Sequence, residues 1–293
     1  MDIIALLIGL GPLLGWGLFP TIASKFGGRP VNQIFGATVG TLIFAIILAV
    51  VKGIGIPGGM ALIFSIISGA VWAFGQIITF KAFGLVGSSR AMPITTAFQL
   101  LGASLWGVFA LGNWPGIANK MIGFVALIVI LVGACMTVWS EKSEQEYSQN
   151  LRKAVVLLLI GEIGYWVYSA APQATDIGGL KAFLPHAIGM VIVAVIYALM
   201  NMNKGNAFKE AVSWKQIISG FFFAFAALTY LISAQPNMNG LATGFVLSQT
   251  SVVLATLTGI FFLNQKKTPK ELMITIVGLV LILIAASVTV FIK

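Results

Sequence analysis

One acidic residue, Glu162, lies inside a segment that is long and apolar enough to cross a membrane. It comes nine residues after Lys153, so at about 1.5 Å of rise per residue it lies roughly 14 Å from that charged edge. This depth is close to the middle of a hydrocarbon layer about 30 Å thick. An ionisable group so deep is costly to keep and by default marks a functional site. Glu162 therefore predicts proton or substrate coupling in a transporter.

Other polar side chains share one face of the same segment. They follow Glu162 at the spacing of a single helix face, which we expect to look into a bundle: Tyr165, Trp166, Ser169 and Gln173. An acid shielded there could exchange protons near neutral pH. A proton that crosses about 150 mV releases about 3.5 kcal/mol, enough for a sugar gradient of roughly a few hundredfold. The alternatives are substrate binding without coupling and a permanently protonated structural acid.

Two glutamines, Gln99 and Gln249, are expected near the middle of their own segments. A primary amide both donates and accepts hydrogen bonds, as a sugar hydroxyl does, so the pair favours substrate contact. Thr95 accompanies Gln99, and Gln76 is a further candidate. The alternative is hydrogen bonding between helices, which is common in membrane bundles.

Aromatic rings inside the segments could stack on the apolar face of a sugar. Trp16 follows Pro12 by four residues, where glycine and proline should loosen the helix and free backbone carbonyls. Packing alone is the alternative for any single ring, although we expect at least one to line a cavity. The candidates are Trp16, Trp72, Tyr165, Trp166, Tyr168 and Tyr230.

The composition excludes several classes of protein. The 293 residues are 59% hydrophobic and only 9% charged, whereas soluble domains carry about 25% charged residues. The net charge of +9 is scattered between apolar segments, so nucleic-acid binding is not expected. Neither a metal cluster, a phosphate loop nor an activated nucleophile is apparent, so we expect no metal, no cofactor and no enzyme. His186, beside Pro185, is expected to be solvated or to cap a helix.

The apolar runs predict an all-α membrane protein with ten transmembrane helices and no β-barrel. The polar stretch 140–152 is expected to link a first repeat, residues 1–139, to a second repeat, residues 153–293. The predicted helices lie near 2–22, 31–51, 59–82, 91–111, 119–139, 153–172, 182–201, 215–234, 240–263 and 272–292.

Basic residues predict the orientation of these helices in a cell membrane. With ten helices, 13 of the 17 Lys and Arg residues lie on the side reached after the odd-numbered helices. Cytoplasmic loops carry the excess of basic residues. Both termini are therefore predicted to be extracellular and the 140–152 linker cytoplasmic. The N-terminus lacks the pattern of a cleaved signal peptide, so we expect an uncleaved first helix.

Five helices in each half predict an inverted five-plus-five repeat, an arrangement common in secondary transporters. Weak internal matches support it. The matched groups are Gly9 and Pro20 with Gly161 and Pro172, residues 67–69 with residues 218–220, and Gln99 with Gln249.

Long runs of the sequence resemble the glucose/ribose porter family of the drug/metabolite transporter superfamily. They include FGGRPVNQIFGATVGTLIFAIILAV, SSRAMPITTAFQLLGASLWGVFALGNWPG, LLLIGEIGYWVYSAAPQAT and SAQPNMNGLATGFVLSQTSVVLATLTGI. The resemblance covers essentially the whole chain and implies inward transport of a sugar, ribose first and glucose next, with protons. It implies no particular site residues, so those above rest on their chemistry.

The sequence thus predicts a monosaccharide importer that works by proton symport and alternating access. Its partners would be the sugar, protons and the lipid bilayer. A monomer is expected, or a weak homodimer if the small-residue face of Gly36 and Gly40 meets a second copy. The alternatives are an exporter of drugs or small metabolites on the same fold, an uncoupled sugar uniporter, and a membrane sensor or scaffold.

Overall fold

The computed structural model describes residues 3–110, 114–141, 145–170, 177–233, 238–239, 244 and 247–291. Side chains at 103, 107, 110, 145–146, 169–170 and 290–291 are outside this description. Every element found in these ranges is a helix. Seven helices are long and apolar enough to cross a membrane. The protein is therefore an all-helical, multi-pass membrane protein.

Each predicted segment overlaps an observed helix, with shifted ends. α7 begins inside the expected linker, and the described part of α12 begins well after residue 240. The helices are α1 (Ile3–Gly9), α2 (Gly11–Phe26), α3 (Pro30–Lys52), α4 (Gly59–Val86), α5 (Ser88–Ala110), α6 (Ile117–Val138), α7 (Gln145–Ala170), α8 (Gly179–Met200), η2 (Met202–Lys204), α9 (Ala211–Lys215), α10 (Ile217–Ser233), α12 (Ser251–Phe262) and α13 (Pro269–Phe291).

The break between α1 and α2 falls where glycine and proline occur together. Pro12 occupies the first turn of α2, where its missing N–H costs nothing, but that missing donor interrupts a helix arriving from α1. Gly11 lies directly against Thr229 of α10, and a side chain at that position would collide with it. The first predicted helix is therefore two helical pieces, as its composition indicated.

Helices cross closely where glycine removes the side chain. A Cβ at Gly15 of α2 would collide with the carbonyl oxygen of Phe222 in α10, and one at Gly164 of α7 would collide with that of Val71 in α4. Gly40 of α3 lies in the same way against α10. Gly36 and Gly40, the small residues of α3, are thus in contact with α9, Gln216 and α10 of the same chain.

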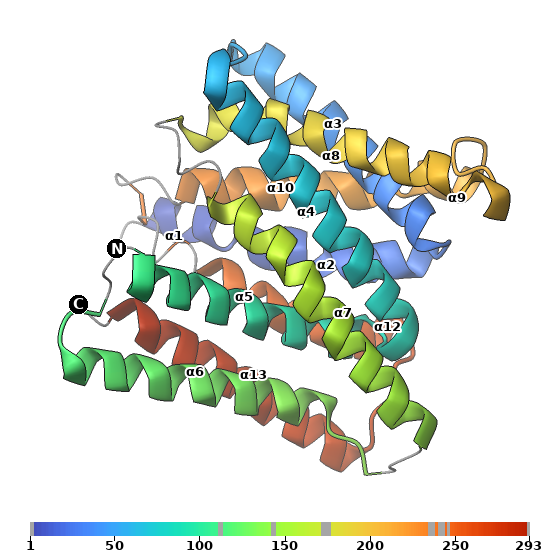
Figure 1. Ribbon diagram of the computed structural model, residues 1–293. Helices are drawn as coiled ribbons and strands as arrows, with labels where there is room; N and C mark the ends of the chain where they lie inside the picture. Colours follow the sequence, from blue (N-terminus) through green and yellow to red (C-terminus); the bar gives the residue numbers. More distant parts are fainter. Residues whose placement is uncertain are drawn as a thin grey trace.

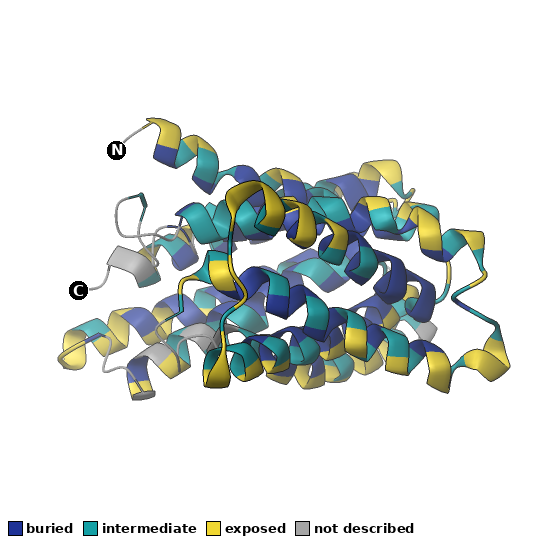
Figure 2. Cartoon of the chain, turned by 90° about the horizontal axis from the view of Figure 1, so that it is seen from above, coloured by how far each residue is buried: buried dark blue, intermediate teal, exposed yellow. Residues whose placement is uncertain are grey.

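Two further crossings complete the bundle. Gly189 of α8 lies against the Ile66 carbonyl of α4, and Gly133 of α6 and Gly278 of α13 lie against each other's carbonyl oxygens. α6 and α13 pack mainly against each other along one edge, and α5 joins them to the rest (Figure 1). Buried residues concentrate on the inward faces of the helices, while the exposed ones follow their outer faces and ends (Figure 2). The outer apolar faces are the surface that lipid would cover.

Candidate functional site

Glu162 lies at the contact between α5 and α7, and its side chain is 0% exposed. The Thr95 hydroxyl of α5 donates a hydrogen bond of 3.0 Å to Oε1. Oε2 is buried and has no hydrogen-bond partner among the described residues. The Gln99 amide, one turn further along α5, interacts with the same carboxyl without reaching full hydrogen-bond geometry. Three residues predicted from the sequence therefore meet here.

Tyr165, one turn along α7 from Glu162, joins this helix to α4. Its hydroxyl donates to Oε1 of Gln76 at 2.8 Å and lies 3.0 Å from the Thr79 hydroxyl. Both partners are buried, so the three side chains satisfy one another away from solvent. Gln76 was predicted as a weaker candidate, and it belongs to the same network as Tyr165.

A row of aromatic rings continues from this network across the centre of the bundle. Tyr165 packs on Trp72 with ring centroids 6.5 Å apart, and Trp72 packs on Phe223 of α10 at 4.3 Å. Phe223 lies 6.3 Å from Trp16 of α2, and Trp16 lies 5.7 Å from Tyr230. The indole nitrogen of Trp16 is buried and has no hydrogen-bond partner among the residues that the structure describes. Two predicted rings, Trp16 and Tyr230, are thus brought together.

The remaining predicted residues are placed less centrally or lie outside the description. Gln249 is 6% exposed and donates to the Ser248 hydroxyl at 3.4 Å. Trp166 is 36% exposed, and its indole donates to the Phe98 carbonyl at 3.3 Å, so the ring lies at the edge of the α5–α7 contact. This position differs from the inward-facing one expected for Trp166. The Ser169 side chain lies outside the described residues.

The expectation for His186 is wrong. The residue lies two turns inside α8, because that helix begins at Gly179 and continues through Pro185. His186 is 7% exposed and is hydrogen-bonded through Nε2 to the Ser68 hydroxyl of α4. Ser68 in turn donates to the Tyr168 carbonyl of α7 at 2.7 Å. A buried side chain therefore joins three helices, α4, α7 and α8, where a solvated one was expected.

Charged residues gather at one end of the bundle, where α2 and α12 end and α5 begins; we call it the basic end. Arg29 forms an ion pair of 2.6 Å with Glu210, and Asn32 donates to the other oxygen of that carboxyl at 2.6 Å. These hydrogen bonds hold the pKa of the Glu210 carboxyl below its ordinary value. Lys267 donates to the Thr137 carbonyl at 2.6 Å, and burial lowers the pKa of its ammonium group to about 8.

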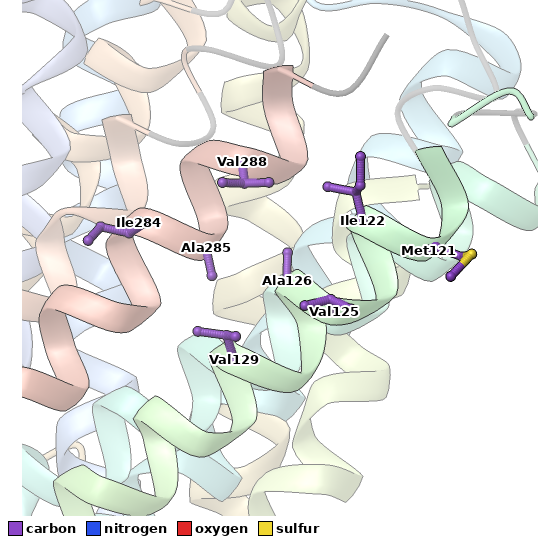
Figure 3. A pocket seen from close by; sticks show the side chains of 8 residues that line it. All are labelled: Met121, Ile122, Val125, Ala126, Val129, Ile284, Ala285 and Val288. Carbon is purple, nitrogen blue, oxygen red and sulfur yellow. The ribbon is translucent and has the colours of Figure 1, made fainter. Parts of the chain in front are cut away.

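Two grooves on the outer surface lie away from the polar cluster. One, of about 420 Å³, runs between α6 and α13 and is lined by apolar side chains such as Val125 and Val288 (Figure 3). The other is lined largely by residues of α6, including Leu131 and Cys135. Neither offers the hydroxyls or amides that a sugar needs, so both are surfaces for lipid. Among the described residues, no group of three metal-ligating side chains occurs.

These features define a class. A multi-pass helical bundle with polar side chains enclosed at its centre and apolar faces outside is an arrangement that secondary transporters share. The family model described as "Sugar transport protein" matches residues 7–292. The chain belongs to this family of sugar transporters, and the protein is a transporter rather than an enzyme.

Curated relatives carry similar names. The chain is 89% identical to the "Putative ribose uptake protein RbsU" of Staphylococcus epidermidis strain ATCC 12228, over 100% of both chains. It is 77% identical to the protein of the same name from Staphylococcus aureus strain N315, again over 100% of both chains. A solved structure described as "Crystal structure of protein" has a TM-score of 0.66 and 17% identity, and covers 99% of both chains. That likeness bears on the fold alone.

Proposed function

We propose that the protein imports a monosaccharide, with ribose the first candidate and glucose the second, by proton symport through alternating access. Glu162 would carry the proton. The observation that carries the proposal is the Glu162 carboxyl, which is enclosed between α5 and α7, with one oxygen bonded and the other without a hydrogen-bond partner in the described part of the chain. The names of the staphylococcal relatives favour ribose.

The surroundings of Glu162 support a proton-carrying role. The ion pairs found among the described residues join Arg29 to Glu210 and Lys270 to Glu141, and neither involves Glu162. A bare carboxylate enclosed without a cation is costly, whereas a protonated carboxyl needs only hydrogen bonds. The loaded transporter, with the acid neutral, would therefore change conformation more easily than one with a charged acid.

The groups around Glu162 suit a sugar. Hydroxyls and amides at Thr95, Gln99 and Gln76 can donate and accept, as the hydroxyls of a pentose or hexose do. The aromatic row from Trp72 to Trp16 offers faces to the C–H side of a sugar ring. Gln249, Tyr230, Tyr165, Trp166 and Ser169 complete the set of residues proposed to contact substrate or to position those that do.

An inverted repeat of five helices on each side, ten in all, would give this site its two access routes. Pairs of close crossings support the repeat: Gly15 on Phe222 resembles Gly164 on Val71, and Gly40 on Ile217 resembles Gly189 on Ile66. The matched positions are 149 to 151 residues apart. Rocking of one half, residues 1–139, against the other, residues 153–293, would expose the centre to each side in turn. Both termini would be extracellular and the 140–152 linker cytoplasmic.

The test is sugar accumulation in proteoliposomes under an imposed proton gradient, with labelled ribose and glucose. The wild type should concentrate sugar, and Glu162→Gln should abolish concentration while sparing exchange of labelled for unlabelled sugar. Glu141→Gln, at the end of the bundle, is the matched control and should concentrate sugar normally.

Each other outcome assigns a different function. A wild type that equilibrates sugar but never concentrates it would be a uniporter, and the coupling role of Glu162 would be lost. Saturable uptake of neither sugar would leave export of another metabolite as the better account.

A further inference from the structure

Six buried polar side-chain atoms have no hydrogen-bond partner among the described residues, and they occur on four helices only. α2 carries Trp16 and Ser24, α5 carries Ser89 and Arg90, α7 carries Glu162, and α12 carries Thr256. In the described parts of the other transmembrane helices, the buried polar side-chain atoms have hydrogen-bond partners. Thr41 of α3, Thr79 of α4, Thr137 of α6 and Thr275 of α13 all donate to backbone carbonyls of their own helices.

Four of the unpartnered groups extend from the centre toward the basic end. Ser24 follows Trp16 by eight residues along α2, a distance of about 12 Å, and lies in the last turn of that helix. Ser89 and Arg90 lie in the first turn of α5. Thr256 lies midway along α12. They start at the level of the aromatic row and reach the end where Arg29 and Lys267 gather.

Packing places these groups around one seam. The Thr21 and Thr258 hydroxyls are 2.6 Å apart, which joins α2 to α12, and Gly259 lies against Ser89, which joins α12 to α5. Ser24 is three residues after Thr21 and therefore lies on the side of α2 that faces α12. Thr256 is three residues before Gly259 and lies on the side of α12 that faces α5.

An unpartnered buried hydroxyl destabilises the fold, because it has given up water and gained nothing. A threonine or serine in a helix can normally avoid this by donating to a carbonyl of the preceding turn, as Thr275 does. Ser24, Ser89 and Thr256 do not. These hydroxyls are explained if they form hydrogen bonds in another conformation of the protein. In a transporter, the partner in that conformation would be the sugar or the water that accompanies it.

We propose that the seam between α2, α12 and α5 is the path by which sugar leaves the central site, lined by Ser24, Thr256 and Ser89, with Arg90 at its mouth. In the conformation described here the seam is closed. It opens when the two halves rock, and the three hydroxyls then bond to the passing solute. This path rests on the transport function proposed above, but neither on proton coupling nor on which sugar is carried.

Cysteine labelling tests the path. Cys135, exposed on α6, is first replaced by alanine. Single variants Ser24→Cys, Ser89→Cys and Thr256→Cys are then exposed to a charged, membrane-impermeant thiol reagent from each side of inside-out and right-side-out vesicles. Thr137→Cys and Thr275→Cys are matched controls, because both positions are 0% exposed near the same end but carry satisfied hydroxyls.

We expect the three path cysteines to react at least about tenfold faster than the controls, and from the basic end only, since such rates follow the population of the open state. Ribose should change the rates of the path cysteines and leave the controls unaltered. Reaction of all five at one rate would overturn the path. The labelling rates are measured without any sugar accumulation, so a result that disproves proton coupling would not affect the test of the path.

A second measurement, which compares thermal stability with sugar exchange, tests the path even if a cysteine variant folds poorly. Thr256→Val and Ser24→Ala remove hydroxyls that have no partner, so the melting temperature should not fall, while sugar exchange should slow by about fivefold, the worth of one neutral hydrogen bond. Thr275→Val removes a bonded hydroxyl and should lower the melting temperature with exchange intact. Unchanged exchange in both path variants would contradict the proposal.

Discussion

Two helix crossings at the centre of the molecule share a backbone plan and differ in chemistry. Where α7 crosses α4, Gly164 allows close contact and the next residue, Tyr165, packs on Trp72. Where α2 crosses α10, Gly15 allows close contact and the next residue, Trp16, packs on Phe223. Trp72 and Phe223 then touch each other, so the crossings meet ring to ring.

The difference lies at the polar tips. The Tyr165 hydroxyl is bonded to Gln76 and lies beside Thr79, whereas the Trp16 indole N–H has no partner within the described ranges. Glu162, two residues before Gly164, occupies the position that Leu13 holds before Gly15. One crossing therefore carries a fixed polar network and an acid, and the other carries an aromatic wall with a single free donor. The backbone plan is nearly symmetric, while the chemistry is concentrated on one side.

Alanine at either crossing glycine should have the largest effect on stability. A new Cβ at Gly164 or Gly15 meets a backbone carbonyl, which cannot move aside as a side chain can, so we expect a loss of about 1–3 kcal/mol in each case. Thermal unfolding in detergent measures it. Gly84→Ala in α4, where nothing lies within 4 Å, is the control and should be neutral or stabilising. A loss at one crossing alone would break the structural equivalence.

Removing the polar group of the aromatic side chain should have a different effect at each crossing, on stability at Tyr165 and on sugar binding at Trp16. Tyr165→Phe keeps the ring but leaves the Gln76 oxygen buried without a donor, so we expect about 1–3 kcal/mol of destabilisation. Trp16→Phe breaks no hydrogen bond among the described residues, so the loss of the indole N–H should show in sugar binding. We expect the apparent affinity for sugar to be about 5- to 10-fold weaker, which is the worth of one neutral hydrogen bond. Unfolding and uptake kinetics on both variants check the contrast, and equal affinity of Trp16→Phe and wild type would argue against it.

The smallest effect is expected where α3 is tied to the segment before α9. Arg29 and Asn32 lower the pKa of Glu210 below its ordinary 4.5, so this carboxylate stabilises the fold above that pH and stops doing so as pH falls through the lowered pKa. The pair is one-third exposed, which limits its contribution to about 0–1 kcal/mol. Melting temperatures of wild type and Glu210→Gln should therefore differ at pH 7 and converge in acid, below the lowered pKa of Glu210. A difference that persists in acid would assign the stabilisation to something other than the charge.

The sequence alone was sufficient to identify the polar residues of the candidate site, because such residues are not expected on a lipid-facing surface. Glu162, Thr95, Gln76 and Tyr165 stand out because hydroxyls, amides and acids are rare in apolar runs, and the structure brings them together in two adjoining contacts. Helix periodicity also gave the direction of each side chain, but not how far a neighbouring helix reaches. Trp166 lies near the face of Glu162 on a helix wheel, yet its side chain is partly exposed at the edge of the contact between α5 and α7, where its indole donates to the Phe98 carbonyl.

Partnerships across the bundle could not be predicted. Phe223 lies in the run FFFAF, where nothing distinguishes the ring that meets Trp72 from its neighbours. His186 was misplaced because Pro185 suggested a helix start, whereas α8 had begun six residues earlier and tolerates the proline. The contact of Phe223 with Trp72 depends on how helices are rotated against one another, whereas the place of His186 depends on where α8 begins, and local composition settles neither.

The pairing of α6 with α13 has a consequence for the surrounding bilayer. Because these two helices pack on each other through Gly133 and Gly278 and join the bundle mainly through α5, we expect them to move together when α5 tilts during transport. The acyl chains along this pair must then stretch or compress to keep its apolar surface covered, at a modest free-energy cost for each ångström of mismatch. Turnover in vesicles should therefore vary with acyl-chain length, even though the sugar never touches this edge of the protein.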